Sequence, residues 1–255
     1  MAELISIRGV KKVYGSGVSE VHAFGPVELD IGPGQFVSLL GPSGCGKSTL
    51  MLMIAGLLDI TSGGILISGK PVTGPQTDIG IMFQDNTLVP WRTVRGNVEL
   101  QLELRGLRPS DHQDRVNGLL RSVHLEDFAG RLPHELSGGM QQRAAFCQAM
   151  VHEPRIMLLD EPLGKLDAMT RERIRTDLQS LWMQQRSTVL FVTHSIEEAV
   201  QLSSRVAIIT PRPGRIDRII PVDLPYPRDI DVKNSPEFTA HVREIQEIFR
   251  GFGVI

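Results

Sequence analysis

The stretch that decides this sequence is "LSGGMQQR", Leu136 to Arg143. Here a serine and two glycines precede a run of helix-forming residues, so Ser137 is a candidate helix N-cap. A helix N-terminus beside glycines can bind an anion, because its first backbone amides have no partner inside the helix. Another glycine-rich loop, "GPSGCGKST" from Gly41 to Thr49, comes earlier, and its Lys47 precedes Ser137 by 90 positions. One nucleotide needs a single cradle, so the second loop calls for a separate explanation.

The earlier loop has the pattern G-x-x-x-x-G-K-[ST] of a phosphate-binding loop, with an apolar stretch before it and a helical one after it. Its glycines permit backbone angles and a close approach that a β-carbon would block. The backbone amides can then point at the phosphates of a nucleotide, Lys47 can neutralise their oxygens and the Ser48 hydroxyl can bind Mg²⁺. The expected nucleotide-binding residues are Gly41, Pro42, Ser43, Gly44, Cys45, Gly46, Lys47, Ser48 and Thr49.

A pair of carboxylates ends the apolar run "IMLLDE", Ile156 to Glu161. The four apolar residues predict a buried strand, with Asp160 and Glu161 at its carboxyl end. Asp160 is expected to hold the metal ion through water. Glu161 is placed to orient and polarise the attacking water as a general base, a role worth about 10²–10⁴-fold in rate. The alternative for Glu161 is a second carboxylate near the metal with no catalytic part.

The Ser137 loop lies far from the first loop in the sequence and is not expected to surround the same phosphates within one chain. Both loops are used if two chains pack head to tail about a two-fold axis. The ATP in the Lys47 loop of one chain then meets Ser137, Gly138 and Gly139 of the other chain. A few hydrogen bonds to the γ-phosphate, worth ~1.5–3 kcal/mol each, would switch a weak dimer on and off. An ordinary capped helix is the alternative.

The composition is that of a globular protein with a sizeable core: 255 residues, 41% of them hydrophobic and 22% charged. A net charge of −2 does not suggest a nucleic-acid partner held by bulk electrostatics. Cys45 and Cys147 are too few for a disulfide framework and are expected to be reduced thiols. No apolar run approaches the roughly 18–20 residues that span a bilayer, and the N-terminus does not resemble a secretory signal. We therefore expect a cytoplasmic chain that reaches a membrane only through a partner.

Strand and helix patterns alternate along the chain. A mostly helical block, residues 89–153, interrupts an α/β core, and a proline-rich segment after Thr210 leads to a final helix. The expected strands are 4–14, 34–40, 63–70, 78–84, 155–162, 187–194 and 205–210. The expected helices are 47–58, 92–106, 111–125, the segment from Ser137 to near Pro154, 169–186 and 235–249.

Beside the other motifs, "LSGGMQQR" resembles the signature of the ATP-binding-cassette (ABC) ATPases. The order of the Lys47 loop, Gln84, the Ser137 loop, Asp160, Asp167 and His194 is similar to that family over roughly residues 4–215. The resemblance implies an α/β fold: a P-loop NTPase with a RecA-like core, an antiparallel β-subdomain and an inserted helical subdomain. It also implies ATP and Mg²⁺ as cofactors, and an ATP-sandwich dimer with a second copy or with a paralogous ATPase.

The implied domain boundaries divide the chain into four segments. Residues 1–88 form the first part of the RecA-like core with the β-subdomain, and residues 89–153 form the helical subdomain with the signature. Residues 154–212 form the second part of the core, and residues 213–255 a short C-terminal extension. This extension is too short for a regulatory domain with a core of its own.

The resemblance assigns four further site residues. Asp167 is expected to contribute to nucleotide binding, and Gln84 resembles the glutamine that reaches both Mg²⁺ and the water. Tyr14 resembles the aromatic residue that stacks on adenine, with an ordinary surface tyrosine as the alternative. His194, directly after an apolar stretch, resembles the switch histidine that contacts the γ-phosphate; a structural histidine is the alternative.

Lys165 departs from the family pattern. The loop "EPLGKLDAMT" has a lysine where related ATPases usually carry a small residue, and that loop is expected to meet its symmetry mate across the dimer axis. Two Lys165 ammonium groups would then lie near each other, or each would pair with a carboxylate of the partner. The sequence leaves both arrangements open.

Among ABC ATPases, the sequence favours the ATP-hydrolysing subunit of an importer. The tail from Arg212 to Phe249 is similar to that of the nitrate/sulfonate/taurine-type importer ATPases. Leu88, Val89, Pro90 and Trp91 resemble part of the groove that receives a membrane permease; a buried Trp91 within the helical subdomain is the alternative. The implied partners are the permease and, indirectly, an extracytoplasmic solute-binding protein, and the implied place is the cytoplasmic face of the membrane.

Two other classes of function fit the sequence less well than transport. Soluble ABC ATPases that act on DNA or ribosomes usually have two cassettes, a long coiled-coil insertion or zinc-binding cysteines. The 90 positions between Lys47 and Ser137 leave no room for a coiled coil, and two cysteines make no zinc site. A small-molecule P-loop kinase has no use for "LSGGMQQR" or for Glu161 beside Asp160.

Overall fold

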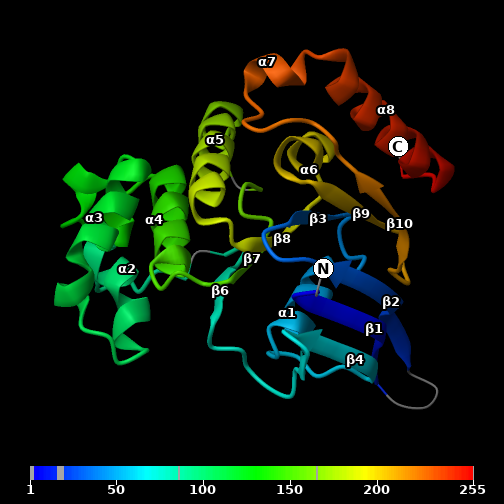
Figure 1. Cartoon of the computed structure of the whole chain (residues 1–255), viewed down its shortest axis with the longest axis horizontal. Coiled ribbons are helices and arrows are strands. Elements are labelled where there is room, and N and C mark those ends of the chain that lie inside the picture. Colours follow the sequence, from blue (N-terminus) through cyan, green and yellow to red (C-terminus); the bar gives the residue numbers. More distant parts are fainter. Residues whose placement is uncertain (1–2, 16–19, 86, 165, 255) are drawn as a thin grey trace. The chain divides into compact units, whose positions relative to one another are not determined.

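The structure is a computed structural model that describes residues 3–15, 20–85, 87–164 and 166–254. The chain divides into two compact units (Figure 1). The first consists of residues 1–77 and 188–255, and the second of residues 78–187. The four segments expected from the sequence stay predictions; the helical block 89–153 falls within the second unit.

The first unit contains a four-stranded antiparallel sheet, in the order β2-β1-β4-β5. Its strands are β1 (Ile5–Tyr14), β2 (Val21–Ile31), β4 (Ser62–Ile67) and β5 (Lys70–Pro71). In β1 the side chains of Ile5, Ile7 and Val10 are fully buried, whereas Arg8 and Lys11 are exposed. The alternation of apolar and polar residues therefore holds one face of this sheet against the core. The expected antiparallel β-subdomain is present.

A second set of strands in the first unit runs in the order β10-β9-β3-β8. These are β3 (Phe36–Leu40), β8 (Thr188–Thr193), β9 (Arg205–Ile209) and β10 (Ile216–Pro221). β3 pairs in parallel with both β8 and β9, and β10 pairs antiparallel with β9. All residues of β3 and β8 are buried, as their continuous apolar runs predict for strands inside a parallel sheet. The helices α1 (Lys47–Ile54) and α6 (Ile196–Leu202) follow β3 and β8.

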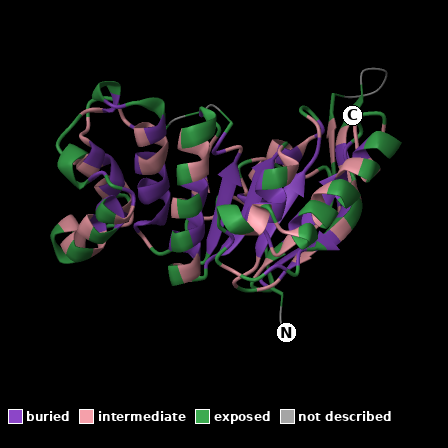
Figure 2. Cartoon of the chain, turned by 90° about the horizontal axis from the view of Figure 1, so that it is seen from above, coloured by how far each residue is buried: buried purple, intermediate pink, exposed green. Residues whose placement is uncertain are grey.

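The second unit combines a parallel strand pair with a group of helices. β6 (Ile79–Met82) pairs in parallel with β7 (Ile156–Asp160). The signature helix α4 (Gly138–Met150) packs against α2 (Val94–Glu103), α3 (Gln113–Ser122) and α5 (Ala168–Gln185). Short 3₁₀ turns lie at Pro109–His112, Glu126–Phe128 and Pro133–Glu135. β6 and β7 are almost wholly buried, while the helices carry exposed residues on one side (Figure 2).

The C-terminal segment packs onto the first unit. Phe238, Ile245 and Phe249 of α8 (Pro236–Gly251) are buried in one cluster with residues of α6, β9 and β10. A short helix, α7 (Ile230–Lys233), precedes α8. The guanidinium of Arg228, 1% exposed, lies 4.1 Å from the ring centroid of Tyr226. It donates to the carbonyl oxygens of Val200, Ser203, Val222 and Leu224. A buried cation with this many acceptors ties the segment to the end of α6.

Most expected elements are present, with ends that differ by a few residues. The first expected helix, 47–58, ends at Ile54, and Gly56 shortly after it has a φ of +69°, a left-handed conformation that does not continue a right-handed helix. The strands and α-helices not predicted as separate elements are β2, β5, β10, α6 and α7. The mixed α/β fold agrees with the sequence expectation. Among the described residues, no helix is long and apolar enough to cross a membrane.

Candidate functional site

The loop from Gly41 to Thr49 connects β3 to α1 and curls around a lysine. Gly44 and Gly46 have φ angles of +75° and +99°, a region that side chains rarely adopt. A β-carbon at Gly46 would also lie 2.6 Å from Cδ2 of Phe24. Nζ of the buried Lys47 donates to the carbonyl oxygens of Gly41 and Pro42, at 2.8 and 2.9 Å. The loop therefore has the form of a phosphate cradle, with the ammonium inside it.

His194 begins at the same edge of the sheet as this loop. Leu40, the last residue of β3, pairs with Thr193 of β8 and with Ile208 of β9. Because the three strands are parallel, their carboxyl ends meet at one edge, where open α/β sheets bind ligands. His194 follows β8 directly and is exposed, just before Ser195, the N-cap of α6. The structure thus brings two separate sequence motifs to one edge.

Tyr14 lies at the end of β1 in the antiparallel sheet. Its side chain is 44% exposed, and Nζ of Lys12 lies 5.1 Å from the ring centroid. An exposed ring can stack on a nucleotide base, but an ordinary surface tyrosine would be equally exposed in the absence of nucleotide. The adenine contact of Tyr14 therefore stays a prediction.

In the second unit, the expected catalytic carboxylate lies beside the expected glutamine. Asp160 is the last residue of β7 and is 7% exposed. Nε2 of Gln84, which follows β6, donates to Oε2 of Glu161 at 3.4 Å. Glu161 has a φ of +43°, in the left-handed region that is uncommon for residues other than glycine. Backbone conformations of this kind cost about 1–3 kcal/mol and cluster at functional sites.

The oxygen ligands available suit the expected Mg²⁺. Among the described residues, no group of three or more His, Cys, Asp or Glu side chains is placed to hold a metal ion. Mg²⁺ does not need such a group, because it commonly takes one or two protein oxygens and completes its shell with phosphate and water. The Ser48 hydroxyl in the first unit, and the Asp160 carboxylate and the Gln84 amide oxygen in the second, are each a ligand of this type. The chemistry of these donors therefore fits the ion.

The signature loop starts α4 and is capped by its own serine. Oγ of Ser137 accepts a hydrogen bond from the Met140 N–H at 3.3 Å. Gly139 is buried, and a β-carbon there would lie 2.5 Å from Cγ2 of Thr170 in α5. Gly138 is exposed, and apart from its two chain neighbours and the nearby backbone of its own helix, no described residue lies within 4 Å of the place its β-carbon would take. The two glycines therefore have different reasons to lack a side chain.

Asp167 is the N-cap of α5. Its Oδ1 accepts a hydrogen bond from the Thr170 N–H at 3.0 Å. Hydrogen bonds from the side chain and the backbone of Thr170 lower the pKa of Asp167 below its ordinary value. The structure thus gives this residue a local role that the sequence analysis did not foresee, and its contact with nucleotide stays a prediction. Lys165 lies outside the described residues, so both arrangements considered for it stay open.

The segment from Leu88 to Trp91 presents an exposed tryptophan. The Trp91 side chain is 79% exposed, which excludes the alternative that it packs inside the helical block. Pro90 is also exposed, Val89 is half-buried and Leu88 is only 8% exposed. Leu88 therefore has little surface to offer, and Trp91 is the main apolar group that this segment presents to solvent.

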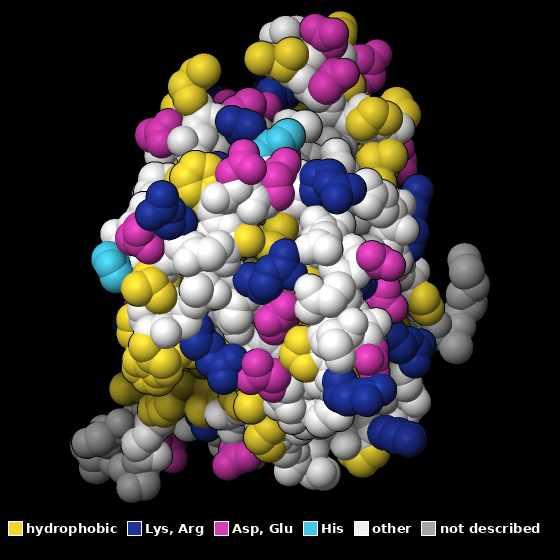
Figure 3. Space-filling model, turned by 90° about the vertical axis from the view of Figure 1, so that its left-hand side faces the viewer, with side chains coloured by type: hydrophobic (Ala, Val, Ile, Leu, Met, Phe, Trp, Pro, Cys, Tyr) yellow, Lys and Arg dark blue, Asp and Glu magenta, His cyan; other side chains and the backbone are white. Residues whose placement is uncertain are grey.

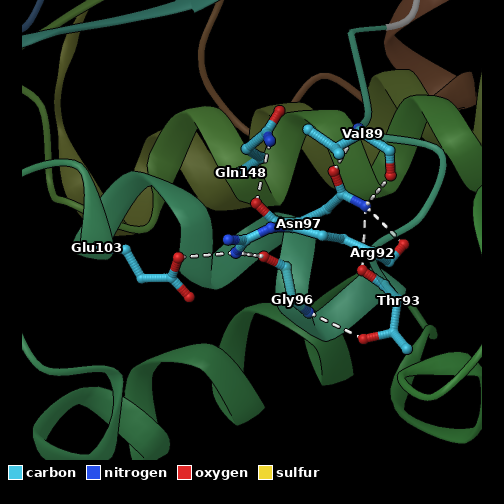
Figure 4. Close-up of polar contacts among 7 residues, drawn as sticks. All are labelled: Val89, Arg92, Thr93, Gly96, Asn97, Glu103 and Gln148. Atoms are coloured by element: carbon cyan, nitrogen blue, oxygen red, sulfur yellow. Dashed lines mark hydrogen bonds and ion pairs between the residues drawn. The ribbon is translucent and has the colours of Figure 1, made fainter.

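A buried asparagine, Asn97 of α2, holds that segment in place (Figure 4). Its Oδ1 accepts from the Val89 N–H at 2.6 Å, and its Nδ2 donates to the carbonyl oxygens of Val89, Arg92 and Thr93 at 3.0–3.1 Å. The Asn97 carbonyl oxygen in turn accepts from Nε2 of Gln148 in α4 at 3.0 Å. Asn97 was not predicted from the sequence. The signal in the sequence that could have indicated it is a polar residue among the apolar positions of α2, Val94, Val98 and Leu102.

The face seen in Figure 3 carries charged side chains of both signs. Lysine and arginine side chains are interspersed there with aspartate and glutamate. Within the second unit, Arg92 and Glu103 form an ion pair at 2.8 Å. Binding at a mixed surface of this kind would depend on local groups rather than on a field of one sign.

Comparison with known proteins identifies the family. A family model described as ABC transporter matches residues 24–164, more than half of the chain. The chain belongs to the ABC transporter family. It is therefore an ATP-binding and ATP-hydrolysing protein, as the sequence predicts.

Individual relatives agree with this assignment over nearly the whole chain. A putative ATP-binding protein of Brucella abortus is 47% identical over 94% of this chain and 91% of its own length. The aliphatic sulfonates import ATP-binding protein SsuB of Bacillus licheniformis is 42% identical over 92% of this chain and 89% of its own. Among solved structures, the ABC cassette MJ0796, in a dimeric post-hydrolysis state with ADP and Pi, is 33% identical. It aligns with a TM-score of 0.76 over 86% of this chain and 99% of that one. The ABC ATPase fold is thus confirmed.

Proposed function

We propose that this chain is the ATPase subunit of an importer and that two copies work as a head-to-tail dimer. The observation that carries the dimer is Gly138, exposed at the start of α4 with no described residue near its missing side chain. Packing within the described part of the chain gives no reason for a glycine at this position. Close approach to the γ-phosphate bound by a second copy would explain the glycine, because a side chain at this position would keep the start of α4 away from the phosphate.

In the proposed cycle, Lys47 and the surrounding amides bind the phosphates, with Ser48, Asp160 and Gln84 as the Mg²⁺ ligands. Ser137, Gly138 and Gly139 of one copy close on the γ-phosphate held by the other copy. Glu161 orients the attacking water and accepts its proton, and His194 contacts the γ-phosphate. Once the γ-phosphate is cleaved, the contacts of the signature loop are lost and the dimer reopens. The dimeric cassette with ADP and Pi among the relatives supports this scheme.

The name of one relative supports a direction and a class of solute. SsuB is named as an import protein for aliphatic sulfonates. We extend this to a small solute of the nitrate, sulfonate and taurine type for the present chain. A separate membrane permease would carry it, an extracytoplasmic solute-binding protein would deliver it, and this ATPase would act at the cytoplasmic face of the membrane.

The exposed Trp91 is the proposed anchor for the permease. Large aromatic side chains dominate the energy of many protein interfaces, provided that they are held in a defined position. The four hydrogen bonds of the Asn97 side chain hold the turn that carries Trp91. Closure of the dimer would then move the permease through this turn.

The test is affinity purification of tagged Glu161→Gln protein with ATP from detergent-solubilised membranes of its source cells. We expect a polytopic membrane protein to be retained, and to be lost when Trp91 is changed to Ala. Leu104→Ala is the matched control, because Leu104 is 70% exposed at the end of α2. Recovery of ribosomal or DNA-associated proteins alone would contradict transport. Sulfonate uptake by cells that lack the gene would contradict the solute class.

A further inference from the structure

The turn between β9 and β10 contacts the phosphate loop through an arginine. Nε of Arg212 donates to the carbonyl oxygen of Gly44 at 2.6 Å. Its Nη2 lies 3.2 Å from the place that a β-carbon on Gly44 would occupy. The two residues are 168 positions apart in the sequence, and both belong to the first unit. The guanidinium therefore lies directly against the loop that holds Lys47.

The same turn reaches the next peptide of the loop through a glycine. Gly214 is buried, and a β-carbon there would overlap the carbonyl oxygen of Cys45. The turn is itself fixed, because the Gly25 N–H of β2 donates to the Gly214 carbonyl oxygen at 2.7 Å. A second bond, from the Thr210 N–H to the Arg215 carbonyl oxygen at 3.0 Å, closes the turn. Arg212 is thus carried by an anchored segment.

Two successive carbonyl groups of the phosphate loop, those of Gly44 and Cys45, consequently face this turn. In a planar trans peptide the N–H points away from the C=O. The N–H groups of Cys45 and Gly46 therefore point away from the turn. They belong to the set of amides that the sequence predicts to face the phosphates.

We propose that Arg212 is a positioning residue for the nucleotide. By holding the Gly44 carbonyl, its guanidinium directs the Cys45 N–H toward the phosphates and adds a positive charge beside them. The bond is charge-assisted, and such bonds are roughly twice as strong as neutral ones. This inference rests on the proposed role of Gly41–Thr49 as the nucleotide cradle.

The test compares Arg212→Ala with Arg215→Ala, a change of an exposed arginine on the same turn. Fluorescent ATP and ADP analogues are titrated into each protein with Mg²⁺, and steady-state hydrolysis of ATP is measured in parallel. We expect Arg212→Ala to weaken binding of both nucleotides by about ten-fold, which corresponds to 1.4 kcal/mol. KM should rise more than kcat falls, because the oriented amide acts on bound nucleotide and transition state alike. Arg212→Lys should recover part of the affinity, and Arg215→Ala should bind like the wild type.

Two further measurements separate the possible failures. Lys47→Ala reports on the cradle: if it binds ATP like the wild type, the cradle assignment is wrong and the inference fails with it. If Lys47→Ala loses binding while Arg212→Ala keeps it, the inference alone is overturned. The melting temperature of each variant without nucleotide tests whether Arg212 only stabilises the fold. Nucleotide binding is then measured at a temperature where every variant is folded. If Arg212→Ala binds ATP and ADP like the wild type at that temperature, the inference is also overturned.

Discussion

The two glycine-rich helix starts of this protein are built in different ways. At α1 the N-cap is Gly46, in the left-handed region, and no side chain caps the helix. At α4 the N-cap is Ser137, whose hydroxyl accepts a backbone N–H of the first turn. A helix start without a side-chain cap leaves its amides for a ligand, whereas a capped start is complete before any ligand arrives. The first loop is thus suited to hold a nucleotide within one chain, and the second to present a preformed surface.

The glycines of the two loops differ in the same way. Gly46 cannot carry a side chain because of its φ angle and because of Phe24. A side chain at Gly139 would press against Cγ2 of Thr170, so one of the two would have to shift. Only for Gly138 is the reason missing from the described part of the chain. The comparison therefore predicts that substitutions at these positions will separate folding, nucleotide binding and dimerisation.

The largest effect is expected from Glu161→Gln, which removes the general base and leaves both loops intact. The rate constant kcat for ATP hydrolysis should fall by about 10²–10⁴-fold, while ATP affinity stays the same. Because the γ-phosphate is no longer cleaved, both loops stay engaged and the dimer should persist with ATP. Light scattering after size-exclusion chromatography measures the dimer, with ADP as the control. Hydrolysis close to the wild-type rate would remove Glu161 from this role.

The next effect concerns folding rather than chemistry. Gly139→Ala brings a β-carbon to 2.5 Å from Cγ2 of Thr170 and should lower the free energy of unfolding by about 1–3 kcal/mol. Urea denaturation measures the loss. Thr170→Ser removes Cγ2, so the double variant should recover most of it. If the double variant is no more stable than Gly139→Ala, the close approach of α4 and α5 is not the reason for this glycine.

Features of the fold and the site could be predicted from the sequence where the residues that determine them lie close together in the chain. The Lys47 loop, the Asp160–Glu161 pair and the Ser137 cap are short patterns whose chemistry is complete within a few residues. β2 was missed because Gly25 and Pro26 interrupt it, and a glycine and a proline within a strand weaken any pattern. α6 was missed because it is only seven residues long, although Ser195 and Glu198 carry a cap signal. Arg212 acts on a carbonyl group 168 positions away that tertiary structure brings to it, so no sequence spacing indicates its role. Asn97 acts on backbone groups only four to eight residues away, but an irregular turn places them there and no short motif describes it.

A smaller effect is expected from Ser137→Ala, which removes the cap of α4. Loss of a serine N-cap costs about 1 kcal/mol of folding free energy. Ser235→Ala is the matched control, because Oγ of Ser235 accepts the Phe238 N–H at 3.1 Å at the start of α8. Urea denaturation should give similar losses for the two variants. Only Ser137→Ala should also weaken the ATP-dependent dimer in the Glu161→Gln background, and equal dimerisation by both would contradict a role for Ser137 at the γ-phosphate.

The smallest effect on stability, and the sharpest test of the comparison, is expected from Gly138→Ala. Because no described residue lies near the new methyl group, the free energy of unfolding should change by no more than about 0.5–1 kcal/mol. Gly118→Ala in α3 is the matched control, since its β-carbon also meets no described residue within 4 Å. In the Glu161→Gln background, Gly138→Ala should weaken the ATP-bound dimer by about ten-fold, a cost of 1.4 kcal/mol, while Gly118→Ala leaves it unchanged. A full-strength dimer in Gly138→Ala would mean that the methyl group meets no second copy, and α4 would then be an ordinary capped helix.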